Sequence, residues 1–307
     1  MSTAQQRRVR LRELIGGPGI VMVPGVATAL NARLAEQAGF EVVFATGSGM
    51  ANTIFGLPDL GLVSMREVVD LTRLIVDATD LPVIADADTG YGNHLNVVRT
   101  TREMEAAGVA AMVLEDQVTP KRCGHFAGKA VVSAREMVEK LVAAVRARRD
   151  PEMVIVARTD AIAVEGLAGA LDRARLYVTA GADVVFVEAP RTLDEVREIP
   201  RAVPAPCLIN IVEGGRTPLL PAAELEEAGY RFALYANVAL RAGSKSVEDA
   251  FAALRRDGGT AALIDRMQGW ARRQESVDLP GWEELDTSIG EAARRIVGDD
   301  GEVRGGS

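Results

Sequence analysis

The chain has 307 residues, of which 43 are Asp or Glu and 35 are Lys or Arg, so its formal net charge is −8. Nearly half of the residues are apolar and a quarter are charged. This composition is typical of a soluble globular protein and excludes a disordered, collagen-like or membrane-spanning chain. An acidic chain without a basic block also lacks the charge pattern of a nucleic-acid-binding protein.

The beginning of the chain superficially resembles a signal peptide, because a basic segment at 5–12 precedes an apolar stretch at 19–30. Acidic and helix-breaking residues at 13–18 separate the two parts, so we expect no cleaved signal. No apolar run reaches the ~20 residues that a membrane span needs. Cys123 and Cys207 are too few for a disulfide framework and lack the CxxC pairs of a structural zinc site. We therefore expect a cytoplasmic protein that does not bind membranes.

From about residue 18 to residue 245, short apolar runs alternate with amphipathic stretches. The apolar runs cover residues 20–24, 42–46, 82–88, 111–116, 154–160, 184–190, 207–212 and 232–236. Most of them are apolar throughout, which is typical of parallel strands covered on both faces. The stretches between them predict helices, among them 66–78, 97–107, 134–148 and 167–180. Eight strand–helix units predict an α/β protein built as one (β/α)8 TIM barrel.

Four predicted helices end in Ala-Gly immediately before the next strand, at Gly39, Gly108, Gly181 and Gly229. Glycine at this position supplies the left-handed cap that lets the chain turn back. Beyond the barrel, residues 246–297 predict a helical C-terminal extension, and residues 298–307 read as a frayed tail. Because no linker-like stretch interrupts the pattern, we expect a single domain.

Carboxylates recur where the predicted strands end, which is the catalytic end of such a barrel. Asp86 and Asp88 are two positions apart and can face the same point, Glu115 and Asp116 end the fourth strand, and Glu188 ends the sixth. Oxygen ligands without histidine or thiolate suit Mg²⁺ or Mn²⁺, held partly through water. A single Asp at one of these positions is better explained as a helix cap than as a metal ligand. For Asp86, Asp88 and Glu115 together we favour a metal site.

Cationic and anion-binding groups occupy similar positions. Arg158 ends the fifth strand, where its guanidinium could hold a substrate carboxylate or form an internal ion pair. Thr46-Gly47-Ser48-Gly49 could bind an anion through backbone N–H groups, although a tight turn explains it equally well. The stretch 210–218 also suits an anionic ligand, or a turn with a helix cap, through Asn210, Gly214 and Thr217.

The most unusual stretch is Lys121-Arg122-Cys123-Gly124-His125, within a loop at 117–132 that we expect to act as a lid. The flanking cations should lower the pKa of the Cys123 thiol and suit it to acid–base catalysis. A Cys–His nucleophile, a zinc site and an exposed basic loop are the alternatives. Cys207 is expected to be a buried small hydrophobe. The tryptophans of the extension, at 270 and 282, are expected to pack between helices, within the chain or across subunits.

Together these motifs resemble the isocitrate lyase and phosphoenolpyruvate mutase superfamily over residues ~20–240. The matching stretches are Gly56–Gly61, Asp86–Gly92, Glu115–Gln117, Lys121–His125, Ala157–Ala161 and Asn210–Pro218. The resemblance implies a Mg²⁺-dependent enzyme that binds an α-keto acid or enolate. It also implies a homotetramer of paired subunits that exchange their C-terminal helices.

The resemblance assigns roles residue by residue. Asp86 and Asp88 would anchor the metal with help from Glu115, and Cys123 would transfer a proton to the leaving carbanion. The catalytic residues would be Cys123, His125, Arg158 and Glu188. The substrate contacts would be Thr46, Gly47, Ser48, Asp86, Lys121, Arg122, Gly124, Arg158, Asn210, Gly214 and Thr217.

Within the superfamily, the loop motif resembles both the carbon–carbon lyases and the carboxyphosphonoenolpyruvate phosphonomutase branch. Phe44 stands where isocitrate and methylisocitrate lyases carry a tyrosine, and Val212-Glu213-Gly214-Gly215 resembles the alkylmalate lyase and phosphonomutase branches. We therefore predict a lyase that cleaves a 2-hydroxy di- or tricarboxylate by retro-aldol chemistry. A phosphonate mutase is the first alternative, and a non-catalytic binding barrel is the second.

Overall fold

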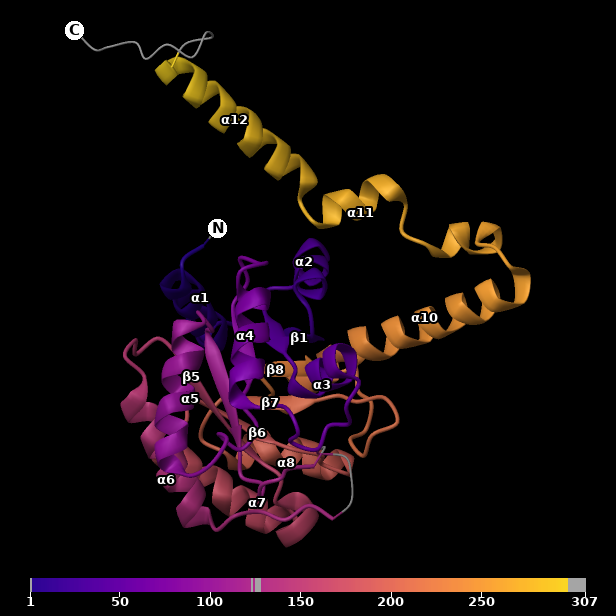
Figure 1. Cartoon of the computed structure of the whole chain (residues 1–307). Helices are drawn as coiled ribbons and strands as arrows, with labels where there is room; N and C mark the ends of the chain where they lie inside the picture. Colours follow the sequence, from indigo (N-terminus) through magenta and orange to yellow (C-terminus); the bar gives the residue numbers. More distant parts are fainter. Residues whose placement is uncertain (1, 123, 125–127, 298–307) are drawn as a thin grey trace, which may run out of the picture. The chain divides into compact units, whose positions relative to one another are not determined.

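The structure, a computed structural model, describes residues 2–122, 124 and 128–297. Eight parallel strands follow one another in chain order and close into a barrel, with the first strand paired to the eighth (Figure 1). The strands are β1 Val21–Val26, β2 Val43–Ala45, β3 Val83–Asp86, β4 Ala111–Glu115, β5 Val154–Thr159, β6 Val184–Val187, β7 Cys207–Asn210 and β8 Phe232–Tyr235. All eight predicted strands are present, and the TIM-barrel prediction is confirmed.

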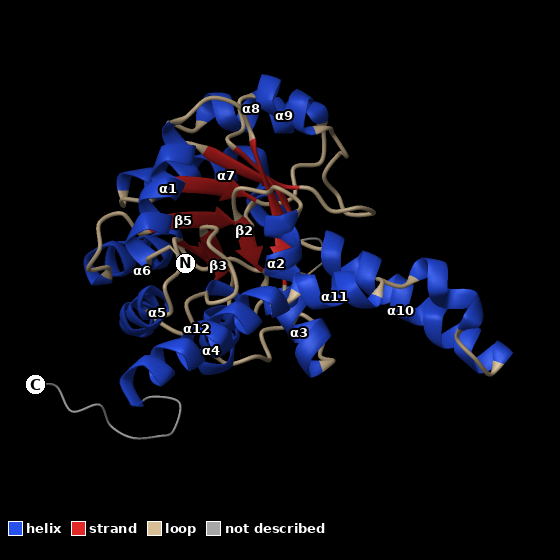
Figure 2. Ribbon diagram, turned by 90° about the horizontal axis from the view of Figure 1, so that it is seen from above, coloured by secondary structure: helices blue, strands red, loops and turns tan. Residues whose placement is uncertain are grey.

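Helices surround the strands, as the view from above shows (Figure 2). The helices of the barrel part are α1 Ala4–Gly16, α2 Ala29–Gln37, α3 Gly47–Phe55, α4 Met65–Val76, α5 His94–Ala106, α6 Ala134–Ala147, α7 Ile162–Thr179, α8 Leu193–Ala202 and α9 Ala222–Ala228. The four glycines predicted to end helices all have positive φ, from +85° at Gly39 to +104° at Gly229. Helix α7 begins earlier than predicted, but Gly166, at φ 77°, breaks it directly before the predicted start.

The barrel interior is filled by apolar side chains from all the strands, including Phe44, Ile84 and Phe186. Leu11 and Leu14 of α1 belong to the same buried cluster, so α1 closes the N-terminal end of the barrel. Two further clusters pack the strands against the surrounding helices. The C-terminal ends of the strands are thereby left as the face at which polar side chains gather.

The basic start of the chain is part of this closure. Arg7 donates hydrogen bonds to the carbonyls of Val76 and Thr79. Arg8 donates to the carbonyls of Glu105 and Val109, and it forms an ion pair with Asp150 at 2.8 Å. Buried carbonyls must find donors, and these arginines supply them where α4 leads into β3 and where α5 leads into β4. The segment therefore has a structural explanation unrelated to targeting.

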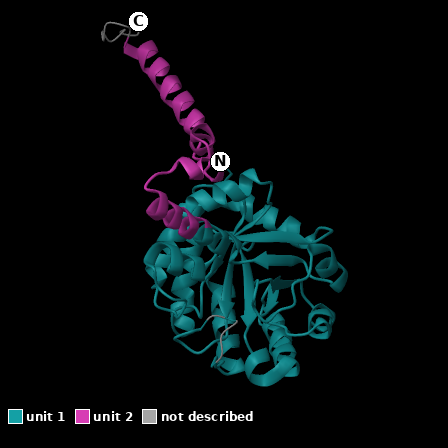
Figure 3. Cartoon of the chain, turned by 90° about the vertical axis from the view of Figure 1, so that its right-hand side faces the viewer, with its two compact units in different colours: residues 1–245 teal, residues 246–307 magenta. Residues whose placement is uncertain are grey.

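The chain divides into two compact units, residues 1–245 and 246–307 (Figure 3). The C-terminal extension comprises the end of α10 Val238–Asp257, a 3₁₀ helix at Ala261–Arg266, α11 Trp270–Ser276 and α12 Leu279–Val297. Trp270 and Trp282 are 72% and 63% exposed in the single chain, so neither is enclosed by its own helices, and their packing across subunits stays a prediction. No residue of α12 is buried, although its apolar side chains lie on one amphipathic helix. No helix within the described ranges is long and apolar enough to cross a membrane.

Candidate active site

The predicted site residues lie where β3 to β7 end. Asp86 and Glu115 are the last residues of β3 and β4, Arg158 is next to last in β5, and Glu188 directly follows β6. Glu115 and Arg158 are paired in register across neighbouring strands. Because parallel strands of a barrel end at one rim, these side chains meet although they are far apart in sequence.

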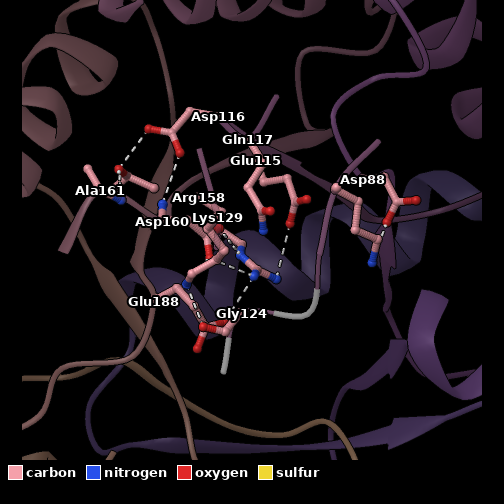
Figure 4. Close-up of polar contacts among 12 residues, drawn as sticks. Asp88, Glu115, Asp116, Gln117, Gly124, Lys129, Arg158, Asp160, Ala161 and Glu188 are labelled. Atoms are coloured by element: carbon pink, nitrogen blue, oxygen red, sulfur yellow. Dashed lines mark hydrogen bonds and ion pairs between the residues drawn. The ribbon is translucent and has the colours of Figure 1, made fainter. Parts of the chain in front are cut away.

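Arg158 is the centre of a buried ion cluster (Figure 4). Its Nε and Nη2 atoms donate to the two carboxylate oxygens of Asp160, at 2.9 and 3.1 Å. Its Nη1 lies 3.3 Å from Glu115 Oε2, and its Nη2 lies 3.4 Å from Glu188 Oε2. The guanidinium also lies over the Phe186 ring, 5.2 Å from its centroid. Burial disfavours the charge, but Asp160, Glu115 and Glu188 outweigh it and raise the pKa of Arg158 well above its ordinary value.

The internal ion pair that was one alternative for Arg158 is therefore present. Most of the guanidinium's five N–H donors face protein carboxylates, which leaves few for a substrate. Gly124 is packed against this cluster, since a Cβ placed on it would lie 2.6 Å from Arg158 Nη2 and 2.6 Å from the Cγ of Glu188. Only glycine allows such a close approach of backbone to these side chains.

Sequence reasoning missed Lys129, which is also part of the cluster. Its side chain is 1% exposed, and its Nζ donates to Asp160 Oδ1 at 2.8 Å and to the carbonyl of Gly124. Burial opposes ionisation of Asp160, but the charges of Arg158 and Lys129 lower its pKa to about 2. Lys129 belongs to a polar loop in which nothing in the local sequence distinguishes it from an exposed lysine.

A second group of charges lies around Asp88. Lys121 Nζ forms an ion pair with Asp59 and lies 3.1 Å from Asp88 Oδ1. Burial raises the pKa of Asp88 to about 6, with Lys121 opposing the shift and Asp86 adding to it. Burial also raises the pKa of Glu115 well above its ordinary value. Such shifts indicate carboxylates whose negative charge is not fully balanced by the protein alone.

Asp86 is held by the backbone around it. Its Oδ2 accepts a hydrogen bond from the N–H of Gly47 at 3.2 Å, and its Oδ1 accepts one from the N–H of Asp88 at 3.1 Å. A Cβ placed on Gly47 would lie 2.9 Å from Asp86 Oδ2. Asp88 itself has φ 46°, a conformation that few non-glycine residues adopt. Asp86, one of the carboxylates predicted to bind a metal, is thus fixed by the glycine turn at the start of α3 and by the backbone of Asp88.

The donor set fits a divalent cation. Among the described residues, Glu115 Oε1 is buried without a hydrogen-bond partner, which is costly unless something binds it. In this part of the chain the site contains six carboxylates, of Asp59, Asp86, Asp88, Glu115, Asp160 and Glu188, and three cationic side chains, of Lys121, Lys129 and Arg158. Among the described residues, however, no three Asp, Glu, His or Cys side chains converge into a complete metal site. A cation here would therefore complete its shell with water or substrate oxygens.

Other predicted contacts are distributed around the same rim. The Thr46 side chain caps α3 by accepting from the N–H of Gly49, and its Oγ1 lies 3.0 Å from Ser48 Oγ. Asn210 Oδ1 and Thr217 Oγ1 are buried and have no hydrogen-bond partner among the residues that the structure describes. In the part of the chain that the structure describes, no hydrogen bond or ion pair joins Asn210, Gly214 or Thr217 to Arg158.

The side chain of Arg122 is exposed, and its backbone N–H and carbonyl form hydrogen bonds with the Gln117 carboxamide, at 3.0 and 2.8 Å. Its role as a substrate contact stays a prediction. The expectation for Asp116 needs correction. Asp116 does not join the carboxylates of the rim. It accepts hydrogen bonds from Thr159 Oγ1 and Tyr177 OH, because consecutive residues of a strand face opposite sides and Asp116 faces the helices.

Of the two cysteines, Cys207 is 1% exposed at the start of β7, and burial raises its pKa to about 12. The interpretation of Cys207 as a buried small hydrophobe is confirmed. Cys123 and His125, which the sequence analysis assigned to catalysis, lie outside the described residues.

Comparison with known proteins identifies relatives along nearly the whole chain. A family described as phosphoenolpyruvate phosphomutase matches residues 11–255. The 2,3-dimethylmalate lyase of Eubacterium barkeri is 44% identical over 276 residues, which make up 90% of this chain and 94% of that protein. The 2-methylisocitrate lyase of Aeropyrum pernix is 43% identical over 285 residues, 93% of this chain and 91% of that protein.

Solved structures of related proteins match the chain over nearly its whole length. The crystal structure of a 2,3-dimethylmalate lyase, described as a member of the PEP mutase/isocitrate lyase superfamily, is 36% identical, covers 99% of both chains and superposes with a TM-score of 0.88. A phosphonopyruvate hydrolase solved with oxalate and Mg²⁺ is 30% identical, with a TM-score of 0.80 over 93% of this chain and 98% of that one.

Proposed function

The chain belongs to the phosphoenolpyruvate mutase/isocitrate lyase superfamily, and we propose that it is a Mg²⁺-dependent carbon–carbon lyase. Its substrate would be a 2-hydroxy di- or tricarboxylate of the 2-alkylmalate or 2-methylisocitrate type. Retro-aldol cleavage would release an α-keto acid and a second carboxylic acid. The observation that carries the proposal is the 43–44% identity to two lyases of this kind over at least nine-tenths of the chain.

The residues of the rim can serve this reaction. Asp86, Asp88 and Glu115 would hold the metal ion, in part through water. When bound, Mg²⁺ would supply positive charge to the oxygens of the emerging keto acid. Lys121, fixed between Asp59 and Asp88, would keep a positive charge beside these carboxylates.

Substrate binding and proton transfer would use other groups. Asn210 and Thr217 offer buried polar atoms that have no partner in the described chain, and α3 offers its N-terminus at Gly47. The 2-hydroxyl group loses its proton to a base of the site and becomes the keto oxygen, while the carbon–carbon bond breaks and leaves an electron pair on the carbon of the departing acid. Cys123 would donate a proton to that carbon, with His125 and Glu188 completing the polar surroundings.

A phosphonate-forming or phosphonate-rearranging mutase is the second candidate. The matched family is described as a phosphoenolpyruvate phosphomutase, and the Gly214-Gly215 pair after β7 resembles the phosphonomutase branch as well as the alkylmalate lyases. The two candidates share a metal-bound keto-acid or enolate unit and differ in the bond that breaks. A binding barrel without catalysis is the third reading.

We also propose that the enzyme is a homotetramer, built from two dimers that exchange their C-terminal helices. Large apolar side chains of the extension, such as Phe251, Trp282 and Ile289, are 59–68% exposed, and a second copy of the chain would cover them. A cytoplasmic location is consistent with Cys207 being a free thiol. The light-scattering mass of the purified protein tests the assembly.

The decisive experiment is a screen for keto-acid release with Mg²⁺ present. Methylisocitrate, isocitrate, 2-alkylmalates and oxaloacetate are incubated with the protein, and products are coupled to keto-acid detection. Release from one of the hydroxy acids supports the lyase. Phosphorus NMR of phosphonate mixtures identifies the mutase instead, and a protein that neither reacts nor binds oxalate in a metal-dependent way would be a binding barrel.

A further inference from the structure

Lys129 is a buried cation that the proposed chemistry does not use. Its side chain is 1% exposed, and Asp160, its carboxylate partner, is fully buried at 0%. Burying a lysine is costly unless its charge is paired and its donors are satisfied. Lys129 meets both conditions through Asp160 and the carbonyl of Gly124.

Asp160 joins Lys129 to the centre of the site. One oxygen of Asp160 accepts from both Lys129 Nζ and Arg158 Nη2, and the other accepts from Arg158 Nε at 2.9 Å (Figure 4). The N–H of Asp160 is in turn held by Asp116 Oδ1 at 2.9 Å. The carboxylate therefore cannot rotate freely, and it fixes the ammonium and the guanidinium with respect to each other.

The other contact of Lys129 reaches the loop that follows β4. The Gly124 carbonyl accepts from Lys129, and the Gly124 backbone packs directly against Arg158 and Glu188. Two residues earlier, the backbone of Arg122 is held by the Gln117 side chain. The chain around Lys129 is itself attached to the end of β4, since the N–H of Val118 donates to the carbonyl of Ala130 at 2.9 Å.

We propose that Lys129 is a positioning residue, which holds the Gly124 backbone against the Arg158–Asp160 pair and thereby sets the geometry of the loop at the reacting end of the barrel. The inference rests on the proposed function for its kinetic consequences. It adds a residue that does not touch the metal-binding carboxylates and that acts through Asp160 and the Gly124 backbone.

The test compares Lys129→Met, which removes the charge and the donors, with Lys129→Arg, which keeps both. Arg135→Met, which removes a cation that is 88% exposed on α6, is the matched surface control. We expect Lys129→Met to lower kcat by about 100-fold, as misplacement by about 1 Å does, with a smaller change in KM. Lys129→Arg should restore much of the loss, and Arg135→Met should behave as the wild type.

A second measurement does not depend on turnover. Hydrogen exchange at the Arg122 and Val118 amides should be faster in Lys129→Met than in the wild type, and Mg²⁺-dependent binding of oxalate should be weaker. If the wild type releases no keto acid in the screen, the proposed function fails while these two readouts still decide the role of Lys129. Wild-type exchange and oxalate binding in a folded Lys129→Met protein would overturn the inference. A wild-type kcat in Lys129→Met would also overturn it, and so would a Lys129→Arg variant that is as impaired as Lys129→Met. If Lys129→Met does not fold, the Arg variant and its exchange pattern decide.

Discussion

Gly47→Ala should separate the geometry of the metal-binding carboxylates from the stability of the fold. Gly47 is the first residue of α3, and its N–H donates to Asp86 Oδ2 at 3.2 Å. The added methyl group would lie 2.9 Å from that oxygen and 3.3 Å from the Asp86 Cγ. Normal contacts at these atoms are nearer 3.5 Å, so the carboxylate must move by about 0.5 Å or lose its hydrogen bond to the turn.

Catalytic groups must be held within about 0.5 Å of their productive positions, and misplacement by about 1 Å costs on the order of 100-fold in rate. We therefore expect Gly47→Ala to reduce kcat by about 10-fold and to raise the Mg²⁺ concentration needed for half-maximal activity. Alanine favours a helix over glycine by up to about 1 kcal/mol, which offsets part of the steric cost. The melting temperature should accordingly change little.

The matched control is Gly243→Ala, in α10, where an added Cβ meets no atom within 4 Å. It should stabilise the helix and leave the kinetics unchanged. Keto-acid release at varied Mg²⁺, together with thermal unfolding, measures both variants. If Gly47→Ala keeps wild-type kcat and wild-type Mg²⁺ activation, catalysis does not depend on the hydrogen bond that places Asp86 beside Gly47. The assignment of Asp86 to the metal site is then refuted.

Three further predictions address the cysteines and the metal. Cys123→Ser should slow turnover greatly without changing the melting temperature, and near-normal rates would remove Cys123 from the mechanism. Asp88→Ala should abolish metal dependence, and Mg²⁺-stimulated activity in that variant would argue against the site. In the folded protein, burial raises the pKa of Cys207 to about 12, above the ~8.5 of an unfolded thiol. The contribution of Cys207 to the free energy of unfolding is therefore fully present below pH ~8.5 and is lost as the pH rises from there toward 12. In the Cys123→Ser variant, a thiol reagent at pH 8 should therefore react only after denaturant is added, and Cys207→Ala should flatten the alkaline loss of stability.

The barrel could be predicted because its signals are local. A strand covered on both faces must be apolar throughout, and a helix that returns to such a strand ends at a glycine with positive φ, as at Gly39 and Gly229. The positions of Asp86, Glu115 and Arg158 follow from the same reasoning, because strand ends converge at one rim. These predictions needed only the hydrophobic pattern of the strands and helices and the rule that the site of such a barrel lies at the C-terminal ends of its strands.

What the sequence could not reveal depends on which way a side chain turns and how far it reaches. Asp116 is adjacent to Glu115, yet one faces the helices and the other the barrel interior. Lys129 reaches Asp160, 31 residues further along the chain. Arg7 and Arg8 resemble the basic end of a signal peptide until their carbonyl partners around the barrel are known. Each case is a contact between distant segments, for which a single sequence carries no local signal.

The surroundings of Arg158 change how substrate binding should be pictured. As a free guanidinium, it would hold a substrate carboxylate by two parallel hydrogen bonds. With Asp160, Glu115 and Glu188 already around it, a second full pair would require one of these carboxylates to leave. Asn210 Oδ1 and Thr217 Oγ1 are buried and lack partners in the described chain, so a bound ligand that hydrogen-bonds to them removes an energetic cost. A 2-hydroxyl group could donate to Asn210, and a carboxylate could accept from Thr217. Arg158 would then act mainly by fixing the carboxylates that surround the reacting centre.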